Sequence, residues 1–288
     1  MTSRSHFRLE IASATDAGVI RSFNEDSIAT DNDLGLLVLA DGMGGYKSGD
    51  VASALATGAV VDYLKRKWNS AVSQPQSSAQ SGQFSPESLA VRSAIEKTNR
   101  AIHQTAQTDS KYTGMGTTIV VALFHHDRAT VAHVGDSRLY RLRQGRLELL
   151  THDHSLLQEQ LETGLISSED AKVSHNRNLV SRALGAEAEI RVDVSEHPVH
   201  ANDIYLLCSD GLNDMVDDAD IELAISELRA NLPLAANQLV QMANDNGGHD
   251  NVSVLIAKVM DGAAEEPSLM DRMFGWLKSF RINTAWRN

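Results

Sequence analysis

The 288-residue chain lacks several features that would indicate a secreted or membrane protein. It has one cysteine, Cys208, which excludes an intrachain disulfide and indicates a reducing compartment. No run approaches the ~18 consecutive apolar residues that a membrane-spanning helix needs. The opening sequence MTSRSHFRLE also lacks the apolar segment of a secretory signal. We therefore expect a soluble, cytoplasmic protein.

The chain also has fewer basic than acidic residues. The chain has 26 Lys and Arg against 38 Asp and Glu, which gives a formal net charge of −12. Such a surplus of carboxylates disfavours a general nucleic-acid-binding or anionic-membrane-binding surface, and it leaves room for bound cations. With 42% hydrophobic residues the chain has enough apolar side chains for a sizeable core.

Hydrophobic patterns indicate strands and helices that come in runs instead of alternating strictly. Alternating or continuous apolar stretches predict strands over residues 7–13, 34–40, 117–124, 129–135, 138–143, 146–150, 203–209 and 251–259. Helical spacing predicts helices over 49–68, from Ser85 onward, and over 155–163, 219–228 and 234–244. This order favours an α+β fold (αββα), in which a central sandwich of two mainly antiparallel β-sheets is flanked by helices.

Composition divides the chain into one large domain and a short tail. Residues 1–262 carry the strands and helices, with a polar Ser/Gln-rich loop at about 69–85 and a polar, inserted subdomain at about 151–195. The tail, 263–288, has an amphipathic pattern of Met, Phe and Leu with basic residues nearby. Packing of the tail against the domain is the favoured interpretation, and docking to a partner or a membrane surface is the alternative.

Four aspartates stand at predicted strand ends. Asp41 follows the buried run in LLVLADGMGG, Asp210 follows IYLLCS, Asp136 follows AHVG, and Asp250 precedes NVSV. If they meet at one edge of the sheets, their unpaired charges require either a bound cation or raised pKa values. A site built from oxygen ligands suits Mg²⁺ or Mn²⁺. We expect the glycines after the aspartates, such as Gly42, to clear space beside the metal.

The chain resembles the metal-dependent serine/threonine protein phosphatases of the type 2C family in their bacterial form. The resemblance runs from about residue 7 to residue 259 and follows the order of the family's motifs. Each fragment alone is weak, but the ordered set is specific. The motifs are RSFNED, LADGMGG, GMGTT, VGDSRLY, RNLVSRALG, CSDGLND and GHDNVSV.

This resemblance implies a set of ligands for two core Mn²⁺ or Mg²⁺ ions. Asp41 matches the carboxylate that bridges both ions, and the Gly42 carbonyl matches a ligand of the second ion. Asp210 and Asp250 match further ligands of the first ion. Glu25 matches a residue that reaches the second ion through water.

Further roles follow from the same resemblance. Asp136, together with Asp210, is expected to hold a weaker third ion. Arg21 matches the arginine that grips the substrate phosphate, and its planar guanidinium suits two parallel hydrogen bonds. Residues 151–195 correspond to the family's variable flap, in which His175 is expected to face substrate.

The expected reaction is hydrolysis of phosphoserine and phosphothreonine in proteins by a hydroxide that bridges two divalent metals. The expected catalytic residues are Arg21, Asp41, Asp210 and Asp250. No cysteine nucleophile is needed, so Cys208 is interpreted as a buried packing residue. Animal members have a histidine where this chain has Met43, which cannot donate a proton, so water is the expected general acid.

The expected partners are phosphorylated proteins, namely a bacterial serine/threonine kinase and its substrates. The phosphatase would reverse the action of that kinase. No nucleic-acid partner is expected. Two alternatives stay open: a catalytically silent scaffold that binds phosphoproteins, and a phosphatase dedicated to one regulatory protein in a partner-switching pathway. The retained aspartates favour an active enzyme. Two histidine pairs, His125 with His126 and His152 with His154, have spacings found in metal sites, but the favoured interpretation is ordinary loop histidine.

Overall fold

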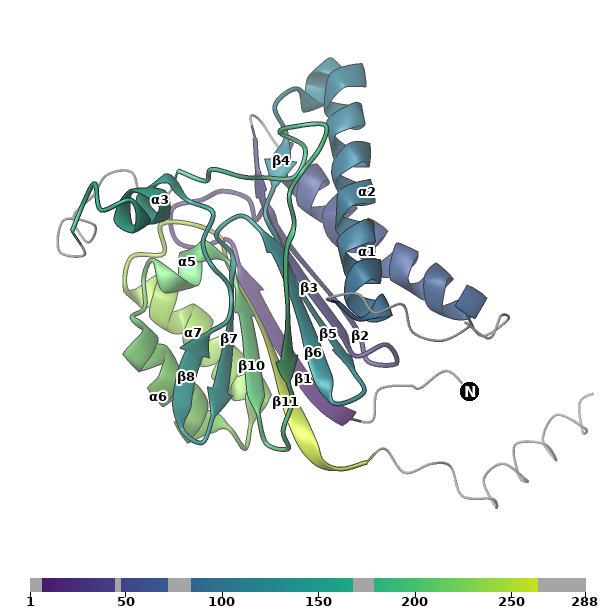
Figure 1. Ribbon diagram of the computed structural model, residues 1–288. Helices are drawn as coiled ribbons and strands as arrows, with labels where there is room; N and C mark the ends of the chain where they lie inside the picture. Colours follow the sequence, from purple (N-terminus) through teal and green to yellow (C-terminus); the bar gives the residue numbers. More distant parts are fainter. Residues whose placement is uncertain (1–6, 45–47, 72–83, 168–178, 264–288) are drawn as a thin grey trace, which may run out of the picture.

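The computed structural model describes residues 7–44, 48–71, 84–167 and 179–263, and its strands form two sheets (Figure 1). All paired strands within each sheet are antiparallel. The first sheet has the order β1 (Phe7–Asp16), β11 (Val252–Ala263), β10 (Ile204–Cys208), β7 (Arg138–Arg143) and β8 (Arg146–Leu149). The second has the order β2 (Asp26–Asp31), β3 (Leu36–Met43), β5 (Ile119–His125), β6 (Arg128–Val134) and β9 (Asp193–Pro198), with β4 (Gly116–Thr117) paired to β3.

Helices flank the two sheets on opposite sides (Figure 1). The pair α1 (Gly49–Ala71) and α2 (Pro86–Thr108) packs on the second sheet, while α6 (Asp218–Leu228) and α7 (Leu232–Asp245) pack on the first. Three short helices complete the described set: η1 (Ser110–Tyr112), α3 (Leu156–Glu162) and α5 (Asp210–Asn213). The αββα arrangement expected from the sequence is confirmed.

The period-2 geometry of a strand explains why the first five residues of β3, Leu36 to Ala40, are all apolar. Leu36 and Val38 pack toward the helices α1 and α2, whereas Leu37 and Leu39 pack between the two sheets. Successive side chains of a strand point to opposite faces, so a strand with both faces covered needs no polar position. All four of these side chains are fully buried.

Several boundaries differ from the sequence expectation. The strand β3 continues to Met43 instead of stopping at Ala40, because the backbone of Gly42 and Met43 pairs with β4. The strands β2 and β9 were not anticipated, since their polar sequences lack an apolar run. Both form register pairs with the apolar strands β3 and β6, so tertiary pairing outweighs local pattern.

The loop, flap and tail expected from the sequence lie largely outside the residues that the structure describes. The helix α1 ends at Ala71 and α2 begins after the N-cap Ser85, whose hydroxyl accepts a hydrogen bond from the backbone N–H of Ser88. Within the expected flap, α3 is described and 168–178 lies outside the described residues. The tail 264–288 also lies outside them. No helix in the described part of the chain combines the length and apolar character required to cross a bilayer.

Candidate metal centre

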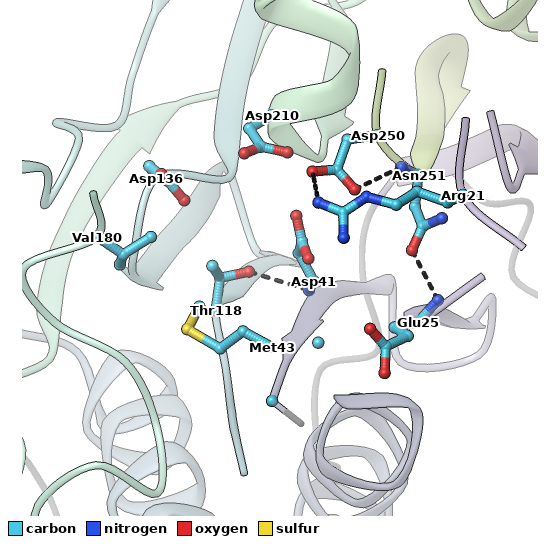
Figure 2. A pocket seen from close by; sticks show the side chains of 12 residues that line it. Arg21, Glu25, Asp41, Met43, Thr118, Asp136, Val180, Asp210, Asp250 and Asn251 are labelled. Carbon is cyan, nitrogen blue, oxygen red and sulfur yellow. Dashed lines mark hydrogen bonds and ion pairs between the residues drawn. The ribbon is translucent and has the colours of Figure 1, made fainter. Parts of the chain in front are cut away.

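A cleft of about 240 Å³ opens at one end of the two sheets (Figure 2). It is lined by one basic and five acidic side chains together with small and polar residues. The acidic residues come from segments far apart in the sequence, so only the fold brings them together. The lining residues are Arg21, Glu25, Asp41, Gly42, Met43, Gly44, Thr118, Asp136, Val180, Asp210, Asp250 and Asn251.

Each of the four expected aspartates lies at a strand end or just beyond one. Asp41 is the sixth residue of β3, and Asp136 lies in the turn between β6 and β7. Asp210 begins the short helix α5 two residues after the end of β10, and Asp250 lies two residues before the start of β11. The structure therefore brings together all four, with Glu25 and Arg21, around one cleft.

The aspartates of the cleft repel one another when charged. Burial raises the pKa of Asp41 well above its ordinary value, and the neighbouring Asp26 and Asp210 carboxylates raise it further. Burial likewise raises the pKa of Asp210, with Asp136 the largest charged contribution. The pKa of Asp136 rises to about 7, from burial first and then from Asp153. Without a counter-ion the cleft does not accommodate all these charges.

Unpaired oxygen atoms support the same conclusion. The buried Oδ1 atom of Asp210 has no hydrogen-bond partner among the described residues, and the same holds for Oδ1 of Asp26. A buried carboxylate oxygen without a donor is costly, and a divalent cation satisfies it with ligand bonds. Because all the donors are carboxylate and carbonyl oxygens, the cleft fits a hard cation such as Mg²⁺ or Mn²⁺.

Asp26 is a buried acid of this region that the sequence analysis left out of the candidate set. It pairs directly with Asp41 in the register of β2 and β3, and its Oδ2 accepts a hydrogen bond of 2.8 Å from the Ser209 hydroxyl. Its pKa is raised to about 6 by burial, although hydrogen bonds from Ser253 and Ser209 oppose the shift. The sequence RSFNED, taken alone, is typical of a solvated loop, and in the alternative interpretation Glu25 and Asp26 hold metal-bound waters.

Arg21 provides the single basic side chain among the described residues that line the cleft. Its guanidinium NH2 lies 2.7 Å from Oδ2 of Asp250, and the Arg21 side chain is 54% exposed. Such an exposed pair contributes little to stability. Arg21 is therefore free to exchange a carboxylate partner for another anion without a large cost.

Asn251 positions the loop that carries Arg21 and Glu25. Its Oδ1 accepts a 2.8 Å hydrogen bond from the backbone N–H of Glu25, and its Nδ2 donates to the carbonyls of Ala17 and Phe23. Its own N–H donates to Oδ1 of Asp250 (Figure 2). Asn251 thus joins the N-terminal loop to the ligand candidate Asp250, a role that its place in GHDN hinted at but did not define.

Two threonines of GMGTT fix the backbone of Asp41. The Thr118 hydroxyl accepts a hydrogen bond of 3.0 Å from the Asp41 N–H (Figure 2), and the Thr117 hydroxyl donates to the Asp41 carbonyl at 2.7 Å. Thr118 also bonds the Ser137 hydroxyl, the neighbour of Asp136. The backbone positions of two aspartates are therefore connected through buried hydroxyl groups.

The glycines of the two Asp-Gly pairs have a different purpose from the one expected. A Cβ atom on Gly42 would lie 2.1 Å from the Gly49 carbonyl oxygen, and one on Gly211 would lie 2.1 Å from that of Asn251. Both glycines therefore allow close approach of another backbone segment, instead of clearing room for a metal. The close approach at Gly42 seats the start of α1 beside the cleft.

Other expectations concern residues away from the cleft. Cys208 is fully buried in β10, and burial raises the pKa of its thiol to about 12, which agrees with a packing role. His175 lies outside the described residues, so its proposed contact with substrate stays a prediction. The His152 ring contacts the Glu162 carboxylate, and His154 lies beside Asp193, so the two histidines of that pair have different partners.

Comparisons with known proteins agree with this geometry. A family model described as Protein phosphatase 2C matches residues 20–246. The serine/threonine phosphatase stp of Listeria monocytogenes is 36% identical over 249 residues, which cover 85% of this chain and 93% of the relative.

Solved structures show the same fold. The serine/threonine phosphatase PstP/Ppp of Mycobacterium tuberculosis has a TM-score of 0.76 and 34% identity, with 88% of this chain and 99% of that chain covered. The S. agalactiae serine/threonine phosphatase has a TM-score of 0.74 and 34% identity, with 87% and 99% covered. A structure of the PstP catalytic domain in complex with two manganese ions has a TM-score of 0.74 and 34% identity, with 88% and 99% covered. On the family match and these similarities, the chain belongs to the protein phosphatase 2C family.

Proposed function

We propose that this protein phosphatase hydrolyses phosphoserine and phosphothreonine in proteins, with two divalent cations held in the carboxylate cleft. One observation carries the proposal: five carboxylates and a single arginine line the same cleft. The relative described with two manganese ions supports the number and kind of cation.

The proposed ligands are those that the sequence singled out. Asp41 would contact both core ions, the Gly42 carbonyl and Glu25 would belong to the second, and Asp210 and Asp250 to the first. All five line the cleft. When bound, Mn²⁺ or Mg²⁺ lowers the pKa of a water, so that hydroxide is available near neutral pH, and offsets negative charge on the phosphoryl group.

A third, weaker ion is proposed at Asp136 and Asp210. The support is electrostatic: Asp136 is 6% exposed, and it makes the largest charged contribution to the raised pKa of Asp210. Asp153 and Asp214 add further negative charge around Asp136. A cation bound there would offset the repulsion between Asp136 and the acidic side chains around it.

Arg21 is proposed to bind and orient the substrate phosphate. Its guanidinium already contacts one anion, the Asp250 carboxylate. The Arg21 side chain is exposed enough to turn toward a ligand at the mouth of the cleft. The planar guanidinium offers two parallel hydrogen bonds to a phosphoryl group and does not lose its proton. Met43 also lines the cleft, but its thioether has no proton to donate, so the leaving alkoxide needs water as its acid.

The biological setting that we propose is reversal of phosphorylation by a bacterial serine/threonine kinase. A phosphatase dedicated to one regulatory protein uses the same cleft and differs only in substrate. A catalytically silent scaffold is disfavoured because a chain that only binds phosphoproteins has no need for a cluster of mutually repelling acids.

One assay tests the proposal. Purified protein should hydrolyse an aryl phosphate and a phosphothreonine peptide with Mn²⁺ or Mg²⁺, lose the activity in excess chelator, and resist reagents that alkylate thiols. Peptide binding without phosphate release in either metal would favour the scaffold. Equal turnover in excess chelator would contradict the mechanism.

A further inference from the structure

A second cluster of metal-binding side chains lies far from the cleft. It consists of Glu87 in the first turn of α2, with His125 and His126 at the end of β5 and in the turn to β6. One ligand atom of each lies within 4.8 Å of those of the other two. The strand β5 begins next to the cleft residue Thr118 and ends at His125, so its seven residues separate the two regions by about 20 Å.

The backbone at His126 brings the two imidazoles together. Adjacent residues of a strand point to opposite faces, which would keep His125 and His126 apart. His126 instead has φ +50°, in the left-handed region that non-glycine residues rarely adopt. As a result the two rings lie 5.8 Å apart between centroids, and Nε2 of His126 lies 3.5 Å from Oε1 of Glu87.

A chain of hydrogen bonds fixes the tautomer of His125. The Ser88 hydroxyl donates to the Glu196 carboxylate at 2.6 Å, so its oxygen accepts from the Thr130 hydroxyl at 2.7 Å. Thr130 has then used its only proton and must accept from Nε2–H of His125 at 2.8 Å. The proton of neutral His125 is therefore on Nε2, and Nδ1 carries a lone pair.

That lone pair has no partner. Nδ1 of His125 is buried without a hydrogen bond among the described residues, and the residue is 5% exposed. Burial also lowers the pKa of His125, which keeps its ring neutral as a metal ligand must be. An imidazole whose opposite N–H donates into a network ending at a carboxylate is the usual support of a metal-binding histidine.

We propose that Glu87, His125 and His126 form a second metal site, which binds Zn²⁺ through two imidazoles and one carboxylate. This donor set suits zinc, and it differs from the all-oxygen cleft that suits Mg²⁺ or Mn²⁺. Tetrahedral ligands at about 2.1 Å from zinc lie about 3.4 Å from one another. The His126–Glu87 distance already matches this value, and both side chains are partly exposed, at 48% and 21%, so they can adjust.

The site would join two elements that are distant in sequence. Glu87 belongs to the start of α2, while the histidines belong to the β5–β6 hairpin on which α2 packs. A cation bound to both binds the folded chain and not the unfolded one, so it stabilises the domain by mass action.

Zinc titration of the whole protein tests the site. The protein is first saturated with Mg²⁺, which prefers oxygen ligands to imidazole, and is then titrated with Zn²⁺ by calorimetry. In parallel, ¹⁵N NMR of the histidine rings follows Nδ1 of His125. We expect His126→Ala and Glu87→Gln each to lower the affinity for one Zn²⁺ at least tenfold. Both variants should retain Mn²⁺-dependent phosphatase activity, since neither residue lines the cleft.

His152→Ala is the matched control. This exposed histidine pairs with a single carboxylate, Glu162, so its loss should leave zinc binding unchanged. Ser88→Ala should weaken zinc binding in part, because it breaks the network that directs the His125 proton. Equal zinc stoichiometry and affinity in wild type and His126→Ala, or an unmoved His125 ring signal, would overturn the proposal.

Discussion

The strand β10 has an aspartate at each end, and the two have opposite surroundings. Asp203, before the strand, is 1% exposed and receives hydrogen bonds of 2.8 and 2.6 Å from the guanidinium of Arg143, with a third from the His200 N–H. Asp210, after the strand, has a partnerless oxygen and a pKa raised by burial and by other aspartates.

The difference separates a structural acid from a ligand. An arginine and backbone donors satisfy Asp203 within the chain itself, so that end of β10 is complete. The other end collects carboxylates that only an added cation can satisfy. Both residues precede or follow the same apolar run, so burial alone does not identify a metal ligand. The presence or absence of internal donors does.

The largest expected effect comes from removing the acid proposed to touch both core ions. Asp41→Ala should lower turnover by more than about a thousandfold, because the metals supply several kcal/mol of transition-state stabilisation. Calorimetry should show both tight Mn²⁺ sites weakened. Asp136→Ala is the comparison: it should keep two tight sites yet lose turnover. The reverse pattern would show that the ligands are wrongly allocated.

The structural end of β10 should respond in stability instead. Arg143→Ala leaves the buried Asp203 without its charged partner, which should lower the free energy of unfolding by about 3 kcal/mol. Asp210→Asn should raise the stability of chelator-treated protein, because it removes an unpaired buried charge. Denaturant unfolding in chelator measures both. Equal destabilisation by the two variants would erase the distinction between the two ends.

Arg21 should affect substrate binding more than metal binding. Arg21→Ala should raise KM about thirtyfold, equivalent to about 2 kcal/mol for a charge-assisted pair of hydrogen bonds, with metal affinity nearly unchanged. Arg21→Lys should recover only part of the loss because it lacks the planar fork. If Mn²⁺ affinity falls by orders of magnitude instead, Arg21 serves the metal centre and not the phosphate.

The stability of the metal-free protein should also depend on pH. The folded-state pKa values of Asp26, about 6, and Asp136, about 7, lie above their ordinary value of 3.8. The folded state therefore holds these protons more tightly, so the stabilisation is complete below about pH 4 and is lost as pH rises through 6 and 7. Unfolding in chelator should show the free energy of unfolding falling progressively between pH 5 and 8. Saturating Mn²⁺ should abolish this slope, and a slope of opposite sign would contradict the charge repulsion.

Sequence pattern predicted the main strands and helices because apolar periodicity is local. The run from Leu36 to Leu39 could only be a strand buried on both faces, and Ser85-Pro86 marked the start of α2. The polar strands β2 and β9 escaped prediction, since each is a strand only because an apolar neighbour pairs with it. For the same reason the polar sequence around Asp26 favours a solvated loop over a metal-water role, although Asp26 pairs with Asp41 in the sheet.

The residues alone specify the chemistry of the cleft: the order of the motifs and the acids at strand ends indicate oxygen ligands for divalent cations. Which acids are satisfied internally depends on the fold, because the donors to Asp203 and the lack of one at Oδ1 of Asp210 are set by long-range contacts. The fold likewise determines that His125 and His126 meet Glu87, a residue 38 positions earlier than the first of them. A left-handed residue and a packed helix create that proximity, and neither leaves a periodic signal in the chain.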